Sequence, residues 1–178
     1  MKKVKKLFAF LTTLSMVLMM SAHVMAAVDL NAKYEVDTNK IQGWPQAADI
    51  ASDTGILMDA DTGTVLFDKG GDQQRYPASI TKIMTTLLAC ENLSLKTNIV
   101  VSDSASASVS AGDSSIYAAP GEKFTRDQAL MAVMLQSANE MSVAVAEKVS
   151  GSVKKFTELM NWRARLFGCK NTHFNNPN

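Results

Sequence analysis

Ser79 and Lys82 are the two residues of this chain whose types and spacing best fit nucleophilic chemistry. They overlap the start of an apolar pattern spaced as on one face of a helix, formed by Ile80, Ile83, Met84, Leu87 and Leu88. At about 100° per residue, Lys82 lies about 60° from Ser79, and we expect both to lie off the packed face. A serine hydroxyl needs a base to become a nucleophile, and a lysine can be that base when burial lowers its pKa. The pair predicts a lysine-activated serine, although Ser-x-x-Lys alone is more often only a helix start.

Ser137 and Asn139 are a second pair of polar residues in an apolar setting. They lie between residues 129–135, apolar on all sides as in a fully buried helix, and a second helix expected from Glu140 to about Gly151. Buried polar groups need hydrogen-bond partners, so both residues are candidate site residues. The alternative is a break between helices with an asparagine cap.

The other segments are expected to position these four residues. The sequence predicts a β-hairpin formed by residues 55–59 and 64–67. It also predicts a short strand at residues 98–101 and a last helix at residues 152–167. Residues 27–50 read as an extended lead-in, and the serine-rich residues 102–115 as a surface loop. The last helix is expected to bury Val153, Phe156, Leu159, Met160, Ala164 and Phe167 and to expose Lys154, Lys155, Arg163 and Arg165.

Residues 1–26 have the three parts of a secretory signal peptide: a lysine-rich start, an apolar stretch and a small-residue cleavage site. The apolar stretch is short for a membrane span, and an uncleaved anchor is the alternative. Cleavage removes four of the 18 basic residues and none of the 17 acidic ones, leaving 14 against 17, a net charge of −3. Such a chain has no basic surplus for binding nucleic acid.

Other motifs favour structure over chemistry. Asp-Thr-Gly occurs at Asp53 and Asp61, as in aspartic proteases, but the copies are eight residues apart around one short strand, so we interpret them as turns. Cys90 and Cys169 are expected to be free thiols. His173 is the only histidine beyond the signal, so a zinc site is not expected, and a Ser-His-Asp triad is expected only if His173 is its base.

Together, a Ser-x-x-Lys at Ser79 and Lys82 and a Ser-x-Asn at Ser137 and Asn139 resemble the motifs of penicillin-binding proteins and serine β-lactamases. The surrounding residues are most similar to the low-molecular-mass D-alanyl-D-alanine carboxypeptidases, in segments 77–85, 137–140, 160–164 and 171–177. The resemblance runs from about Ile41 to the last residue. It implies an α+β, β-lactamase/DD-peptidase-like fold, in which residues 51–178 supply the N-terminal β-hairpin of the antiparallel sheet and the helical subdomain.

The resemblance also implies a role for each candidate residue. Ser79 would attack the D-Ala-D-Ala bond of a peptidoglycan stem peptide and form an acyl-enzyme, with Lys82 as the base. Ser137 would relay a proton to the leaving amine, Asn139 would hold the substrate's amide backbone, and the Ser79 N–H would supply half of an oxyanion hole. The enzyme would be exported to the cell envelope, need no metal or cofactor, and be acylated by β-lactam antibiotics.

The sequence departs from this family in two respects. It has no Lys-Thr-Gly motif, since its Thr-Gly pairs follow only Asp53 and Asp61, and it has Glu140 where many relatives have aspartate, a minor difference. We therefore expect a chain truncated before that motif, without the later sheet strands or a C-terminal membrane anchor. Such a chain is an incomplete piece of the family's enzyme and need not be active by itself. A serine β-lactamase is one alternative, with Glu140, Glu147 and Glu158 the only acids after Ser137. The others are a non-catalytic peptidoglycan-binding envelope protein and a helical domain with coincidental motifs.

Overall fold

The computed structural model describes residue 29 and residues 31–178, so the predicted signal peptide lies outside the described residues. The chain divides into two compact units, the first ending at Arg75 and the second spanning Tyr76–Asn178, and each is described by itself. Among the described residues, none of the helices has the length and apolar character needed to cross a membrane.

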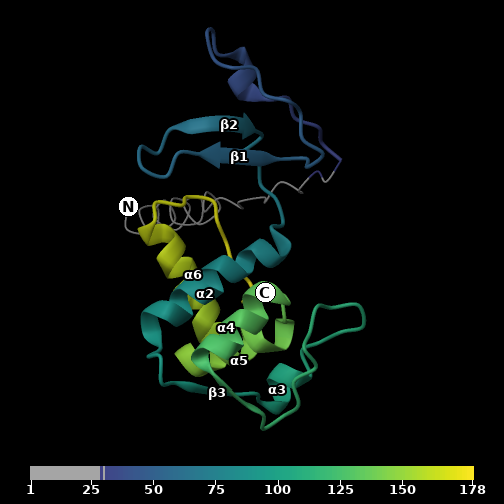
Figure 1. The fold of residues 1–178 in the computed structure, drawn as a ribbon, viewed down its shortest axis with the longest axis vertical. Helices are drawn as coiled ribbons and strands as arrows, with labels where there is room; N and C mark the ends of the chain where they lie inside the picture. The colour runs from purple at the N-terminus through teal and green to yellow at the C-terminus, as the bar shows by residue number, and fades with distance from the viewer. Residues whose placement is uncertain (1–28, 30) are drawn as a thin grey trace, which may run out of the picture. The chain divides into compact units, whose positions relative to one another are not determined.

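The first unit contains the predicted β-hairpin (Figure 1). Strands β1 (Gly55–Met58) and β2 (Val65–Lys69) pair antiparallel, with a bulge between Leu57 and Met58. The connecting turn is fixed by Asp59, whose Oδ1 accepts hydrogen bonds from the backbone N–H and the hydroxyl of Thr62 at 2.8 and 2.6 Å. These bonds give the second Asp-Thr-Gly motif the structural role that was predicted for it.

The lead-in before the hairpin is folded back on itself rather than simply extended. It contains a 3-10 helix, η1 (Asp37–Lys40), and the Asn39 amide exchanges two hydrogen bonds with the backbone of Ala47, at 2.7 and 3.0 Å. The buried Lys69 ammonium then holds the next segment by donating to the carbonyls of Ile50 and Ser52, at 2.8 and 2.9 Å. Side-chain bonds to the backbone, which have no periodic signature, explain why the sequence pattern missed this fold.

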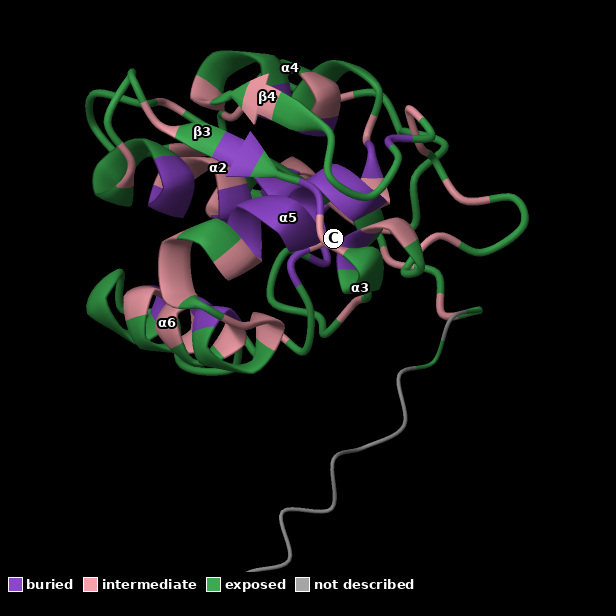
Figure 2. Ribbon diagram, turned by 90° about the horizontal axis from the view of Figure 1, so that it is seen from below, coloured by how far each residue is buried: buried purple, intermediate pink, exposed green. Residues whose placement is uncertain are grey.

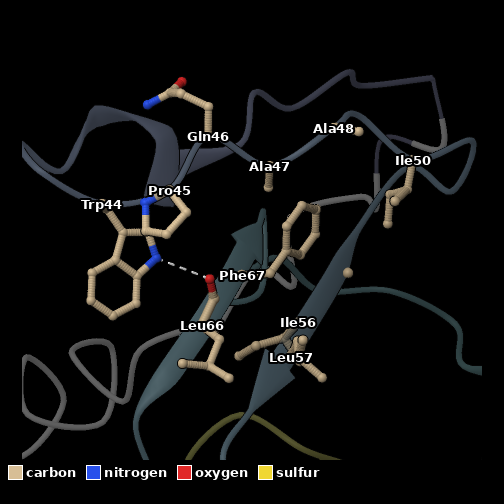
Figure 3. Close-up of a pocket in the computed structure, with 11 residues that line it drawn as sticks. Trp44, Pro45, Gln46, Ala47, Ala48, Ile50, Ile56, Leu57, Leu66 and Phe67 are labelled. Carbon is tan, nitrogen blue, oxygen red and sulfur yellow. Dashed lines mark hydrogen bonds between the residues drawn. The ribbon is translucent and has the colours of Figure 1, made fainter.

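An apolar hollow of about 810 Å³ lies between the lead-in and the hairpin of this unit (Figure 3). Trp44, Ile56, Leu66 and Phe67 are among the residues that line it. The Trp44 indole N–H donates to the Leu66 carbonyl at 3.1 Å and ties the lead-in to β2. None of the four candidate site residues lines this hollow.

The second unit is mainly helical and is built around one buried helix. Its elements are η2 (Ala78–Thr81), α2 (Lys82–Asn92), β3 (Asn98–Val100), α3 (Asp103–Ser106), β4 (Lys123–Thr125), α4 (Arg126–Leu135), α5 (Asn139–Ser150) and α6 (Val153–Leu166). Helix α5 packs against α2, α4 and α6, and every residue from Glu140 to Ala146 is buried (Figure 2). It ends at Gly151, close to the predicted end, and Gly151 has a φ of +78°, a left-handed conformation typical of a glycine that stops a helix.

Two predictions about which helix faces are buried are wrong. Helix α4 is not buried on all sides, because it packs on α5 through Ala129, Leu130 and Val133 and leaves Met131, Met134 and Leu135 exposed. Helix α2 turns Lys82, Thr85 and Ala89 inward, while Ile80 and Ile83 are 67% and 59% exposed. The chain enters α2 through a 3-10 turn with about three residues per turn, so the 100° spacing does not hold at Ser79. Lys82 therefore lies on the packed face.

Between α2 and α4 the chain forms short elements, of which only the strand at residues 98–101 was predicted. The predicted strand at residues 98–101 pairs antiparallel with β4, which places Ile99 opposite Phe124. The segment 102–115, expected to be loop, begins with helix α3, which Ser102 caps by accepting from the Ala105 N–H at 2.9 Å. Three-residue strands and single helical turns are too short for periodicity to reveal.

The last helix and the C-terminal residues are tied to the helical core. Asn161 of α6 both donates to the Phe174 carbonyl and accepts from the Phe174 N–H, each at 2.8 Å, and the buried Thr85 hydroxyl of α2 donates to the Pro177 carbonyl at 2.6 Å. Phe167, expected to be buried, is 55% exposed. Arg163, expected to be solvated, pairs with Glu91 and stacks over Phe167, since its long side chain covers that ring.

Replacing Asn161 with alanine is expected to lower the free energy of unfolding by about 2 kcal/mol, because two hydrogen bonds to the Phe174 backbone are lost. Asn92→Ala is the matched control, since the Asn92 amide makes one local bond to the Leu88 carbonyl and should cost about 0.5 kcal/mol. Urea unfolding followed by circular dichroism measures both. Equal losses in the two variants would contradict the role assigned to Asn161.

Candidate active site

Ser79 lies in the exposed 3-10 turn that precedes α2. The residue before it, Ala78, has a φ of +47°, in the left-handed region that residues with a Cβ seldom adopt. A strained backbone of this kind persists only where its surroundings hold it, and such positions cluster at functional sites. The turn exposes Ser79 at the surface, and its hydroxyl lies within hydrogen-bond distance of Lys82, the first residue of α2.

Lys82 is the residue that brings the candidate group together. Its side chain is only 2% exposed, and its Nζ donates to Ser79 Oγ at 3.2 Å, Ser137 Oγ at 3.1 Å and Asn139 Oδ1 at 2.7 Å. The Ser137 hydroxyl in turn donates to Ser79 Oγ at 2.7 Å. All four residues predicted from the sequence thus meet at one point, although Ser137 and Asn139 are 55 and 57 positions from Lys82.

Ser137 and Asn139 reach this point because the chain breaks between α4 and α5. Ser137 has a φ of +55°, a left-handed conformation that turns the chain out of α4, and Asn139 is the first residue of α5. The Asn139 N–H donates to the Ser114 carbonyl at 2.9 Å, which ties the start of α5 to the segment before β4. The predicted break between the two helices is present, but the asparagine cap is not: Ala138 is the N-cap residue and no side chain caps α5. The side chains of Ser137 and Asn139 instead bond to Lys82.

Burial lowers the pKa of Lys82 below the ordinary lysine value of 10.5, while the negative charges of Asp113 and Glu140 act in the opposite direction. Among the described residues, no carboxylate lies within ion-pair distance of its Nζ. The three hydrogen-bond partners are neutral oxygens, so they do not compensate a full positive charge as a carboxylate would. This is an environment in which a lysine can lose its proton and accept another.

Residues 40–178 match the family model described as D-alanyl-D-alanine carboxypeptidase. The chain belongs to this family. A D-alanyl-D-alanine carboxypeptidase, DacF, of Bacillus subtilis is 42% identical over 127 residues, covering 70% of this chain and 32% of the relative. DacA of Escherichia coli K12 is 33% identical over 180 residues, covering 97% of this chain and 42% of the relative. The chain thus spans 32% and 42% of the length of these two curated carboxypeptidases.

Solved structures place the fold in the same family. A mutant of Streptomyces K15 DD-transpeptidase superposes with a TM-score of 0.70 at 32% identity, covering 74% of this chain and 54% of that one. Penicillin-binding protein 5 of Haemophilus influenzae gives a TM-score of 0.68 at 30% identity, covering 75% of this chain and 40% of that one. The predicted α+β, DD-peptidase-like fold is confirmed.

In the part of the chain that the structure describes, no group of three His, Cys, Asp or Glu side chains lies close enough together to hold a metal ion. Cys90 and Cys169 are both exposed and free. His173 is exposed on the C-terminal segment.

Two acidic residues near this carboxypeptidase-family site were missed as members of it. Asp113 falls in the serine-rich segment that was expected to be a loop. Glu140 follows the Ser-x-Asn motif, where it was expected to begin a helix and was given no role in the carboxypeptidase-like site. Both influence Lys82 electrostatically. The one available signal was Glu140 itself, an acid followed by a mostly apolar segment.

Proposed function

We propose that this chain carries the acyl-transfer residues of an exported serine D-Ala-D-Ala carboxypeptidase, which removes the terminal D-alanine from peptidoglycan stem peptides. The observation that carries the proposal is the buried Lys82 ammonium within 3.2 Å of the Ser79, Ser137 and Asn139 side-chain oxygens. Family membership supplies the reaction, and the cluster supplies a nucleophile, a base and a proton relay. This chain spans less than half of the length of these curated relatives, so the carboxypeptidase activity of the whole protein is itself proposed.

In the acylation step, neutral Lys82 accepts the Ser79 hydroxyl proton while Ser79 Oγ attacks the carbonyl carbon between the two D-alanines. The C–O bond of the ester forms and the C–N bond breaks. The leaving amine takes a proton through the Ser137 hydroxyl, which lies 3.1 Å from Lys82 Nζ and 2.7 Å from Ser79 Oγ. Water then hydrolyses the ester and restores Ser79. The atoms balance without a metal or cofactor.

Asn139 and the Ser79 backbone hold the substrate in this scheme. Because Asn139 Oδ1 accepts from Lys82, the two Nδ2 hydrogens are the part of the amide left to bind a substrate carbonyl. The Ser79 N–H supplies half of an oxyanion hole. β-Lactams would acylate the same oxygen, and the site would act outside the cytoplasm.

The test is release of D-alanine from a peptide ending in D-Ala-D-Ala, measured on this chain and on an extended protein. The extended protein is this chain continued by the C-terminal part of its Bacillus subtilis relative. We expect Ser79-dependent release of D-alanine by the extended protein and slow loss of bound penicillin. Rapid penicillin hydrolysis would favour a serine β-lactamase, and binding of peptidoglycan without release or acylation would favour a non-catalytic envelope protein.

The rate of penicillin acylation is expected to rise with pH along an acidic limb whose midpoint lies below 10.5, because only neutral Lys82 can act as a base and burial lowers its pKa. Asp113→Asn should move this limb to lower pH, since the Asp113 charge raises the pKa of Lys82. Stopped-flow acylation of the extended protein across the pH range measures both. A limb that moves to higher pH in Asp113→Asn would contradict the assignment of Lys82 as the base.

A further inference from the structure

Glu140 is a fully buried carboxylate that the mechanism above does not use. It lies in the first turn of α5, next in sequence to Asn139. Its Oε1 accepts hydrogen bonds from Ser115 Oγ at 2.7 Å, the Ile116 N–H at 2.8 Å and the Ala118 N–H at 3.4 Å. Its Oε2 is buried and has no hydrogen-bond partner among the described residues. A buried carboxylate with only neutral partners is costly for stability, so its presence requires another explanation.

The groups that bind Glu140 all belong to one segment, residues 114–118, which we call the clamp loop. The loop is also joined to the site directly, because the Ser114 carbonyl accepts from the Asn139 N–H at 2.9 Å. Within it, Tyr117 has a φ of +57° and is 85% exposed, and the N–H groups on either side of it are the ones that Glu140 binds. A left-handed conformation at a residue with a side chain is strained and must be held by its surroundings. Glu140 is the group that holds it.

We propose that Glu140 is a positioning residue of the acyl-transfer site, which fastens the clamp loop to the first turn of α5 and so fixes Asn139 and Ser137 relative to Lys82. The inference rests on the proposed function. Asn139 is held on both sides in this arrangement: its N–H binds the clamp loop and its Oδ1 binds Lys82. Releasing the loop would loosen the residue that orients the base.

The Glu140 charge adds a second effect on the same base. Together with Asp113 it favours the protonated form of Lys82, in opposition to burial. Glu140→Gln keeps an acceptor for the clamp loop and removes this charge, whereas Glu140→Ala removes both. The two variants therefore separate the holding of the loop from the setting of the base.

The matched control is Glu147→Ala. Glu147 lies two turns further along α5, and its carboxylate also accepts two hydroxyl bonds, from Ser102 and Ser104 at 2.6 Å each, but these fasten α3 rather than the clamp loop. Both alanine variants remove an anchoring carboxylate from the same helix. If the two variants lose a comparable amount of thermal stability, any difference between their rates of labelling by penicillin comes from the position of the carboxylate.

The experiment measures the second-order rate of labelling by a fluorescent penicillin, as a function of pH, on this chain and on the extended protein. We expect Glu140→Ala to slow labelling about tenfold or more at the best pH, as for loss of charge-assisted hydrogen bonds that position a reacting group. Glu147→Ala should stay within about twofold of the parent, as for an anchor that does not contact the site. Glu140→Gln should lose less rate than Glu140→Ala, and its acidic limb should move to lower pH.

Equal labelling rates in Glu140→Ala and Glu147→Ala would overturn the proposal, as would an unmoved acidic limb in Glu140→Gln. If Glu140→Ala does not fold, Ser115→Ala carries the test, because it removes one bond to the Glu140 carboxylate without changing α5. Labelling of Ser115→Ala at the parent rate would then overturn it. Labelling of the parent protein tests the proposed function, which is refuted if the parent shows no Ser79-dependent labelling. The role of Glu140 is tested by comparing its variants with a parent that does label.

Discussion

Lys82→Met is expected to lower the rate of penicillin acylation by about a thousandfold or more, the range in which a positioned general base contributes to catalysis. Methionine has similar length and fits an apolar surrounding, but it can neither accept the Ser79 proton nor donate to Ser137 and Asn139. Lys82 is 2% exposed and lies between these side chains, so no other titratable group among the described residues bonds to Ser79 Oγ. Stopped-flow labelling of the extended protein measures the loss.

Lys82→Arg distinguishes a base from a fixed positive charge. Arginine keeps the charge and the hydrogen-bond donors, but it does not lose its proton in proteins. If Lys82 acts as the base, the arginine variant should be as slow as the methionine variant. An arginine variant that retains most of the parent rate would show instead that the charge at this position is sufficient, and the proposed mechanism would be wrong.

The same burial predicts how stability depends on pH. Because the folded-state pKa of Lys82 lies below the unfolded value of 10.5, folding disfavours the ammonium form. The resulting cost is present in full below the folded pKa and is relieved as the pH rises towards 10.5. The free energy of unfolding of the parent, relative to that of Lys82→Met, should therefore increase across that window.

Ser137 is the site of the second large expected effect. Ser137→Ala and Ser137→Gly both remove the hydroxyl that lies 2.7 Å from Ser79 Oγ, so each should slow acylation by about a hundredfold or more, as for loss of a proton relay. They differ in backbone freedom, because residue 137 has a φ of +55°. The glycine variant should be about 1 kcal/mol more stable than the alanine variant, since glycine adopts this conformation without strain.

Acylation kinetics and urea unfolding of the two variants separate these contributions. Equal loss of rate with unequal stability is the result expected if the hydroxyl acts in the chemistry and the backbone only positions it. If instead Ser137→Gly labels as fast as the parent, the hydroxyl has no part in proton transfer, and Ser137 serves only as a turn between α4 and α5.

The sequence predicted the parts of this structure that repeat or that carry strong local signals. The hairpin, the four main helices and the end of the third of them near Gly151 all follow from periodicity and turn residues. The four site residues were found because Ser79 with Lys82, and Ser137 with Asn139, are each close in sequence and polar in apolar surroundings. Their meeting point depends on contacts across more than fifty residues, which family resemblance suggested and local spacing could not.

The errors have a common physical origin in packing between elements. A regular helix from Ser79 onward predicts Lys82 off the packed face, whereas the chain enters α2 through a 3-10 turn, and α5 packs against α2. The apolar sequence of α4 predicts a fully buried helix, but α5 is the central buried helix and α4 is exposed on one face (Figure 2). Both helices are apolar, so only the three-dimensional arrangement decides which one is central. The partners of Glu140 come from a loop with no sequence period, so they too required the structure.

The measurement that tests this account most directly is mass spectrometry of the extended protein after reaction with penicillin, with the adduct mapped by proteolysis. A single penicilloyl group on the peptide that contains Ser79, absent from Ser79→Ala and formed slowly in Lys82→Met, is the predicted result. An adduct on Ser137 or on a cysteine, or one that persists in Ser79→Ala, would contradict the assignment of Ser79 as the nucleophile. It would also remove the basis for the roles given to Lys82, Ser137 and Asn139.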